Sequence, residues 1–127
     1  MSPATLSALT FVEPLPGLAP HTDFQLNPVD GAAGLFSLRP TEAPEIRLFV
    51  VDASVYTPSY APDIAAPCRR IGLSSPQEAR VLLVATADGA STTVNLMAPV
   101  LVNESTGASL QAILDGQGWP LRAPLGA

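Results

Sequence analysis

The spacing of proline and glycine is the feature that most constrains how this chain can fold. The 127 residues include 14 prolines and 9 glycines, which are spread along the whole sequence and are not gathered into one linker. Proline fixes φ and removes a backbone donor, whereas glycine permits a positive φ, so both interrupt helices and strands. The sequence therefore predicts many short elements and little long helix.

The segments between these interruptions are rich in aliphatic, β-branched and aromatic residues, which is typical of strands. Ile46–Val51 is the strongest of them, and because it lacks alternation we expect both of its faces to be covered. The other predicted strands are Leu6–Val12, Asp23–Leu26, Gly34–Leu38, Arg80–Thr86, Ser91–Asn103 (one long strand or a bent pair) and Ser109–Leu114. The predicted turns and loops are Pro14–Leu18, Asn27–Gly31, Pro40–Pro44, Asp88-Gly89 and Ser105–Gly107, and Trp119–Leu125 is an extended tail.

Helical signals are few and short. Ile64–Ile71 is a candidate helix that contains Pro67, and Ser75–Glu78 has the Ser and Glu spacing of a capping box with Pro76 at the first helical position. Val55–Pro62 is predicted to be an extended, proline-spaced loop. The pattern predicts an all-β fold: a small closed or partly closed antiparallel β-barrel-like domain with one or two short helical turns, formed by residues 1–127 as a single domain.

The charge of the chain favours some partners and disfavours others. The net charge is −5, and all 6 basic residues are arginines. Such a field repels nucleic acid phosphates and anionic membranes and favours encounter with basic proteins. Cys68 is the single cysteine, so no intrachain disulfide forms and a reducing compartment fits best. The first ten residues lack the features of a secretory signal, and no apolar run is long enough to span a bilayer, so we expect a cytoplasmic protein.

The sequence offers no convincing catalytic set. His21 is the only histidine, and a triad would have to combine it with Asp23 although no nucleophile-elbow sequence is present. Arg69 and Arg70 follow Cys68 and favour its thiolate, but no partner base for a nucleophile is evident. Metal-ligand spacings and cofactor motifs are also missing from the sequence. We therefore expect a binding protein without catalytic residues, cofactor or metal.

Several segments, in this order, resemble the flagellar assembly factor FliW family. They are Leu15–Leu18, Thr22–Phe24, Gly34–Leu38, Phe49–Asp52 followed by Tyr56–Pro62, Asn95–Asn103 and Pro120–Arg122. The resemblance implies a compact β-barrel-like fold without enzymatic activity. It also implies binding to cytoplasmic flagellin and to CsrA, a small basic RNA-binding repressor of flagellin translation. FliW proteins antagonise this repressor, and flagellin that accumulates in the cell occupies them.

The predicted partner-contact residues belong to the two most specific of these segments. They are Asp52, Tyr56, Pro58, Tyr60, Asn95, Pro99 and Asn103. Two simpler interpretations stay open: the two asparagines bond neighbouring backbone, and the Tyr56–Tyr60 loop is a flap over the end of the barrel. A ligand-binding β-barrel and a small enzyme that uses His21 or Cys68 are the alternative functions.

Overall fold

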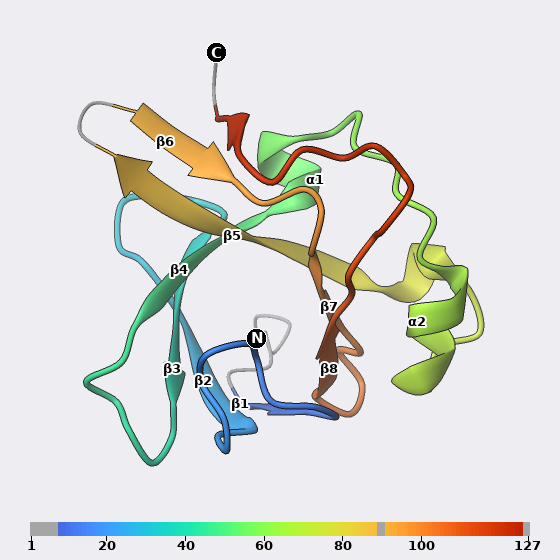
Figure 1. Ribbon diagram of the computed structural model, residues 1–127. Coiled ribbons are helices and arrows are strands. Elements are labelled where there is room, and N and C mark those ends of the chain that lie inside the picture. Colours follow the sequence, from blue (N-terminus) through green and yellow to red (C-terminus); the bar gives the residue numbers. More distant parts are fainter. Residues whose placement is uncertain (1–7, 89–90, 126–127) are drawn as a thin grey trace.

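The fold is a sheet that closes on itself. The computed structural model describes residues 8–88 and 91–125, and most of its elements are strands (Figure 1). The strands are β1 (Ala8–Phe11), β2 (Asp23–Pro28), β3 (Leu35–Pro40), β4 (Leu48–Asp52), β5 (Arg80–Asp88), β6 (Ser91–Val94), β7 (Val100–Val102), β8 (Ala108–Gln111) and β9 (Ala123–Pro124). The helical elements are α1 (Ala53–Tyr56), α2 (Ala65–Arg70) and the 3₁₀ turn η1 (Pro76–Glu78). The predicted all-β class is confirmed.

Seven strands form a closed barrel. The sheet order is β4-β3-β2-β1-β8-β7-β5-β6-β9, and an additional pairing of β4 with β5 closes the ring around all strands except β6 and β9. All neighbours in the ring are antiparallel except β1 and β8, which are parallel. An odd number of strands cannot alternate in direction around a ring, so at least one parallel pair is required. The predicted antiparallel barrel-like fold is confirmed, and among the described strands β1 with β8 is its one parallel pair.

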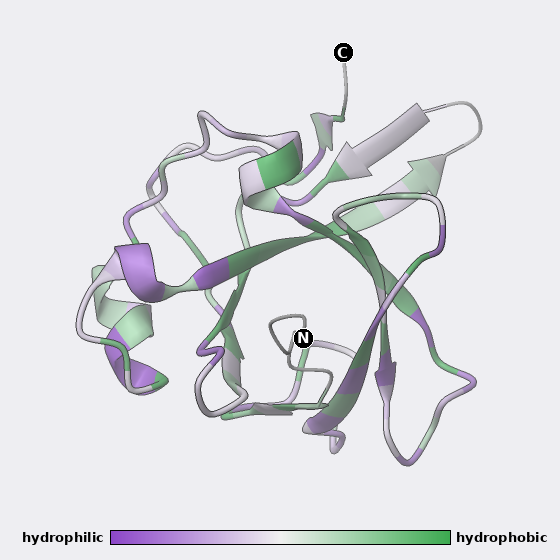
Figure 2. Cartoon of the chain, turned by 180° about the vertical axis from the view of Figure 1, so that it is seen from behind, coloured by the Kyte–Doolittle hydropathy of each residue, from purple (hydrophilic) through white to green (hydrophobic). Residues whose placement is uncertain are grey.

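Alternation of side chains produces the core. Along β1 and β3 every second residue is buried, as expected when one face of a sheet points into a barrel. Phe11 and Phe24 meet edge-to-face inside it, with ring centroids 5.1 Å apart. Figure 2 shows that β5 is hydrophilic at the end where it begins and hydrophobic along its middle. Each fully buried large side chain contributes about 1.5–3 kcal/mol of transfer free energy.

Asn27 and Pro28 belong to strand β2 and not to a loop. The sequence predicts a loop there, but Asn27 pairs with Ser37 and Pro28 with Phe36. Among the described residues β1 pairs with β2 only as far as Gln25, so none of them requires a backbone donor from Pro28.

The second half of the chain corrects three further boundaries. For residues 91–103 the sequence predicts either one long strand or a bent pair of strands. The structure has the pair, because residues 95–99 separate β6 from β7. The last full strand ends at Gln111 and not at Leu114, and the tail contains β9, which pairs with β6. At the other end of the chain, β1 begins at Ala8, and Leu6 and Ser7 lie outside the described residues. Gly89 of the predicted Asp88-Gly89 turn also lies outside them.

The helical elements follow from their caps. The predicted loop Val55–Pro62 is wrong at its start, because Val55 and Tyr56 belong to α1. Asp52 caps this helix by accepting a hydrogen bond from the Ser54 backbone N–H. In α2, Pro67 occupies the first turn, where a backbone N–H has no intrahelical acceptor, so the helix tolerates it. The capping box of Ser75 and Glu78 is confirmed in η1.

Replacement of Asn103 tests a buried polar link of the barrel. Its side chain is 5% exposed, its Nδ2 donates to Ile71 O at 2.8 Å, and its Oδ1 accepts from Ser105 N at 3.0 Å. We expect Asn103→Ala to lower the free energy of unfolding by about 1–3 kcal/mol, because the Ile71 carbonyl then loses its donor. Urea denaturation measures this. The exposed Asn27→Ala should change stability by less than about 0.5 kcal/mol, and equal losses in both variants would contradict the interpretation.

The carboxylate of Glu78 gives a pH test of η1. Hydrogen bonds from the Ser74 side chain and from the Ser74 and Ser75 backbone lower its pKa below the ordinary value of 4.5. A lowered pKa means that the stabilisation is present above the unfolded-state pKa and is lost as pH falls through the folded-state pKa. We expect Glu78→Ala to lower the thermal midpoint at neutral pH, and this deficit to disappear as pH falls through the lowered pKa of Glu78. Gln77→Ala is the control, and a deficit of Glu78→Ala that persists unchanged in acid would contradict this assignment.

Candidate docking surfaces

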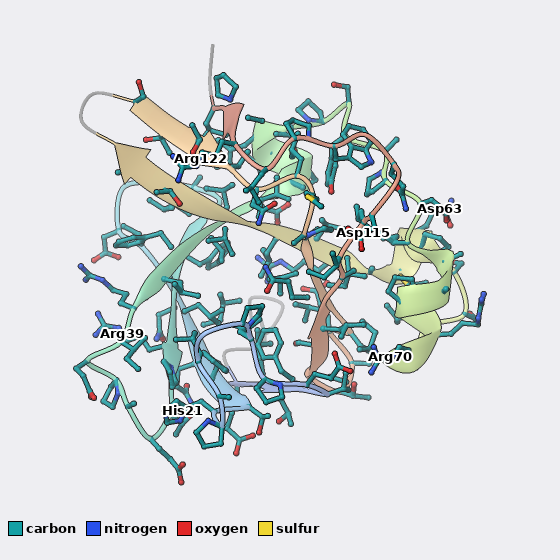
Figure 3. The ribbon with its side chains drawn as sticks, in the orientation of Figure 1. His21, Arg39, Asp63, Arg70, Asp115 and Arg122 are labelled. Atoms are coloured by element: carbon teal, nitrogen blue, oxygen red, sulfur yellow. The ribbon has the colours of Figure 1, made fainter. Side chains whose placement is uncertain are left out.

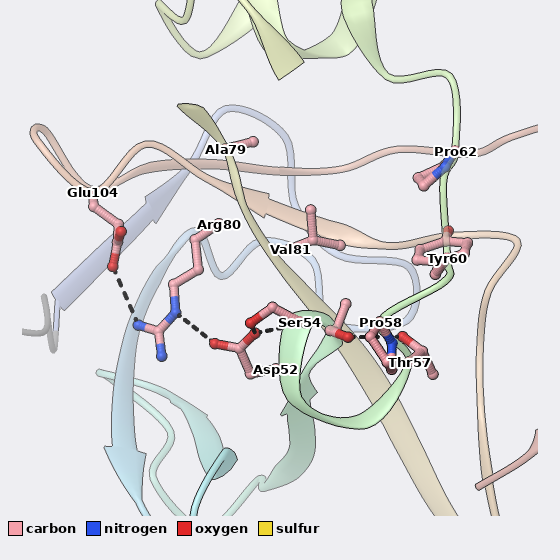
Figure 4. Close-up of a pocket in the computed structure, with 11 residues that line it drawn as sticks. Asp52, Ser54, Thr57, Pro58, Tyr60, Pro62, Ala79, Arg80, Val81 and Glu104 are labelled. Carbon is pink, nitrogen blue, oxygen red and sulfur yellow. Dashed lines mark hydrogen bonds and ion pairs between the residues drawn. The ribbon is translucent and has the colours of Figure 1, made fainter. Parts of the chain in front are cut away.

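A polar groove opens where β4 and β7 end and β5 begins. Its volume is about 420 Å³ (Figure 4), and its charged lining residues are Asp52, Arg80 and Glu104. Arg80 lies between the two acids, with Nε 3.5 Å from Asp52 Oδ2 and Nη1 3.6 Å from Glu104 Oε2. Its guanidinium carbon also lies 4.7 Å from the centroid of the Phe36 ring. We call this the acid-lined groove, because two carboxylates share one cation.

Sheet register assembles the acid-lined groove. Asp52 pairs with Leu82, and Arg80 pairs with Val102, so the ends of three strands meet at one point. Asp52 is further fixed because its Oδ1 accepts from Ser54 N at 2.9 Å and from Ser54 Oγ at 2.6 Å. Charge-assisted contacts are usually about 2.7–2.9 Å long, so both ion pairs of Arg80 are loose. The carboxylates therefore keep the capacity to accept another donor.

An aromatic pocket of about 390 Å³ lies on the other side of the loop formed by residues 57–60. Tyr60 and Trp119 pack edge-to-face with ring centroids 4.7 Å apart. The Tyr60 hydroxyl donates to Leu96 O at 2.5 Å, and burial raises the pKa of this phenol, so it stays protonated. Tyr56 donates to Ala33 O at 2.9 Å, so both ends of the loop are held by phenol groups.

The structure brings some predicted contact residues together and separates others. Asp52, Pro58 and Tyr60 line the acid-lined groove, and Tyr56 joins Pro58 and Tyr60 in the aromatic pocket. Of the remaining three predicted residues, Asn95 lines an apolar pocket at the other end of the barrel, and Pro99 and Asn103 line neither the groove nor the aromatic pocket.

Hydrogen bonds to the backbone fix the two asparagines, and burial fixes Pro99. Asn95 Oδ1 accepts from Met97 N and Ala98 N, both at 3.0 Å. Pro99 and Asn103 are buried. The simpler interpretation of the two asparagines, that they bond neighbouring backbone, is therefore confirmed. A contact of any of the seven residues with a partner stays a prediction.

An apolar pocket of about 530 Å³ lies at the opposite ends of β4 and β7. Its aliphatic wall includes Leu15, Leu18, Leu48 and Met97, and Gln111 is one of two amides in it. None of its lining residues is titratable. Sequence reasoning missed this pocket, and it also missed the roles of Arg80 and Glu104, because nothing local distinguishes them from solvated charges.

The residues considered for catalysis do not meet. In Figure 3 His21 lies on the opposite side of the barrel from α2, the helix that carries Cys68, so the only histidine and the only cysteine cannot act together. Burial and the nearby negative charge of Glu78 raise the pKa of the Cys68 thiol, so the two neighbouring arginines do not activate it. Within residues 8–88 and 91–125 no group of three or more His, Cys, Asp or Glu side chains is placed to hold a metal ion.

The chain is a small β-barrel closed by seven strands, with a polar groove at one end and an apolar pocket at the other. A sequence model described as FliW protein matches residues 2–125. The chain therefore belongs to the FliW family.

Three relatives support the family assignment. Each is a flagellar assembly factor FliW, from Shouchella clausii (26% identical, covering 92% of this chain and 82% of the relative), Moorella thermoacetica (26%, 92% and 77%) and Syntrophotalea carbinolica (28%, 95% and 88%). A crystal structure of the flagellar assembly factor FliW superposes with a TM-score of 0.84 at 18% identity and covers 98% of this chain and 89% of that one. This likeness shows the shared fold. In the described part of the chain, every helix is too short or too polar to cross a membrane.

Thiol reactivity tests the environment of Cys68. Because the thiol is buried and its pKa is raised, we expect a thiol-reactive dye to modify the native protein slowly at neutral pH and to modify the urea-unfolded protein rapidly. The absorbance of the released chromophore measures both rates. Fast modification of the folded chain would contradict the burial of Cys68 and would support the alternative in which this thiol is reactive.

Proposed function

We propose that this chain works in the cytoplasm as a flagellar assembly factor that binds flagellin and antagonises the translational repressor CsrA. It thereby couples the level of flagellin to its translation. Membership in a family of flagellar assembly factors supports the setting. The single observation that carries the proposal is the acid-lined groove, because two loosely paired carboxylates at an open surface suit a basic protein.

Opposite charge favours the encounter of the basic repressor with this groove. The net charge of −5 raises the encounter rate with a basic protein, and this effect weakens as salt screens it. Glu104 is 53% exposed, so it is the carboxylate most accessible to an incoming lysine or arginine. Arg80, only 14% exposed, pairs with both acids and so offsets the repulsion between their negative charges.

Close contacts come from the neighbouring loop. Pro58 borders both the acid-lined groove and the aromatic pocket, and Tyr60 lies between them. Because Tyr60 is anchored through Leu96 and Trp119, the loop loses little conformational freedom when a partner binds. Proline and tyrosine present large, rigid contact area at interfaces. The proposed contact surface is therefore Asp52, Pro58, Tyr60 and Glu104.

Antagonism follows from the charge that the complex retains. A repressor held at an acidic surface has its own cations partly neutralised, and the phosphates of the message meet a negative field. When flagellin accumulates, it occupies the chain and CsrA is released to repress translation. When flagellin is exported, the chain becomes free and binds CsrA again. This cycle requires binding equilibria and no bond making, which fits a chain whose His21 and Cys68 lie apart.

Replacement of Glu104 tests the groove. We expect Glu104→Gln to weaken CsrA binding about three- to tenfold at low salt, because one carboxylate facing the groove loses its charge. Isothermal titration calorimetry with purified CsrA measures the dissociation constants. Glu42→Gln is the matched control, because it makes the same charge change at an exposed residue that does not line the groove.

The same titrations across a series of salt concentrations test whether charge attracts CsrA to the acid-lined groove. Binding of the unaltered chain should weaken as salt rises, and Glu104→Gln should show a smaller salt dependence. Equal affinities of the two variants, or binding that is insensitive to salt, would contradict the proposed role of the groove.

A further inference from the structure

One edge of the barrel is left unpaired where β1 separates from β8. The two strands pair in parallel only at Thr10–Ala108 and Phe11–Ser109. The last hydrogen bond between them runs from Val12 N to Ser109 O at 2.9 Å. Beyond Val12 the chain turns across the mouth of the barrel (Figure 1). The chain after β8 does not turn with it and continues β8 in an extended conformation.

The backbone of this continuation is fixed on one side only. Ala112 N donates to Pro99 O at 2.9 Å, and Leu114 N donates to Met97 O at 2.8 Å. Backbone groups of alternate residues in an extended strand point to opposite sides. The N–H and C=O groups of Gln111 and Ile113 therefore point away from β7. Within the described residues neither forms a backbone hydrogen bond with the chain that follows β1. We call these two residues the β8 edge.

Open space runs along the β8 edge. Gln111 and Ile113 border the apolar pocket, a small cavity of about 90 Å³ next to Glu13 and Pro16, and a groove of about 340 Å³ next to α2. Three consecutive spaces that share the same two residues form one path along the strand. Ile113 is 55% exposed. Exposed edges usually carry a charge or a proline that blocks pairing, and residues 111–113 carry neither.

We propose that the β8 edge binds an extended segment of flagellin by strand addition, with an apolar side chain of that segment in the apolar pocket. Strand addition matches both features: main-chain hydrogen bonds supply affinity, and a pocket beside the strand selects the side chain. The inference rests on the proposed function, because it assigns one of the two proposed partners to a second surface.

The charges around the β8 edge indicate which of the two proposed partners binds there. No titratable side chain lines the apolar pocket, and the charges nearest the other end of the path, Glu13 and Arg70, neutralise each other at 2.9 Å. A segment bound here is therefore uncharged where it meets the strand, and its binding is insensitive to salt. The basic repressor fits the acid-lined groove at the opposite end of β7, so the edge is left to flagellin. Exclusion of the repressor by flagellin then comes from the volume of flagellin and not from shared contacts.

Removal of one outward N–H tests the proposal. Ile113→Pro deletes a donor that the fold does not use, whereas Ile113→Val, the matched control, keeps the backbone intact. We expect Ile113→Pro to weaken flagellin binding about tenfold or more, and both variants to bind CsrA like the unaltered chain. Calorimetry at two salt concentrations measures both partners. Unchanged flagellin affinity in Ile113→Pro, or a loss of CsrA binding alone, would overturn the assignment.

Hydrogen exchange on the unaltered chain provides a test that needs no variant. The amides of Gln111 and Ile113 should exchange rapidly in the free protein and slowly in the flagellin complex. A complex in which both amides stay unprotected overturns strand addition and leaves the proposed function intact. Protection of residues around the apolar pocket without protection of these amides indicates a different ligand mode and also overturns it. If the unaltered chain binds neither flagellin nor CsrA, the proposed function itself fails.

Discussion

The pairing of β4 with β5 is the interaction on which the rest of the structure depends. It turns an open sheet into a ring, so that no strand of the barrel is left with a fully exposed edge. β5 can close the ring because its nine residues are long enough to pair with β4 on one side and with both β7 and β6 on the other. The same register places Asp52 beside Arg80, so closure of the barrel and formation of the acid-lined groove are one event.

The two ends of the barrel differ in chemistry because of where the strands stop. At one end a cap, a strand start and a turn contribute Asp52, Arg80 and Glu104, all of them charged. At the other end the chain after β1 crosses the mouth with Leu15 and Leu18, and this loop leaves an apolar pocket beside the β8 edge. A small scaffold thus has a charged groove at one end of β7 and an unpaired strand edge toward the other end. We propose that this division allows one chain of 127 residues to recognise two unlike proteins.

The elements that neighbouring residues determine could be predicted from the sequence. The features that depend on pairing between distant strands could not. The capping box at Ser75 and the strand around Val50 are visible in the sequence because neighbouring residues determine them. The loop predicted at Asn27-Pro28 became strand because β3 pairs with it. Barrel closure, the meeting of Arg80 with Glu104 and the unpaired edge at Ile113 depend on registers between distant segments. No composition or spacing rule contains that information. The sequence therefore pointed to Asp52 and Tyr60, which line the acid-lined groove, and missed their charged neighbours Arg80 and Glu104.

The central claim is that this chain holds the repressor or flagellin, and that flagellin prevails when it accumulates. The most direct measurement is a competition between the purified proteins, followed by size-exclusion chromatography with light scattering. The complex with CsrA is formed first, and flagellin is then added in increasing amounts. The account predicts that CsrA leaves the complex as an equal amount of flagellin enters it. A stable assembly that contains all three proteins, or CsrA that stays bound in excess flagellin, would contradict it.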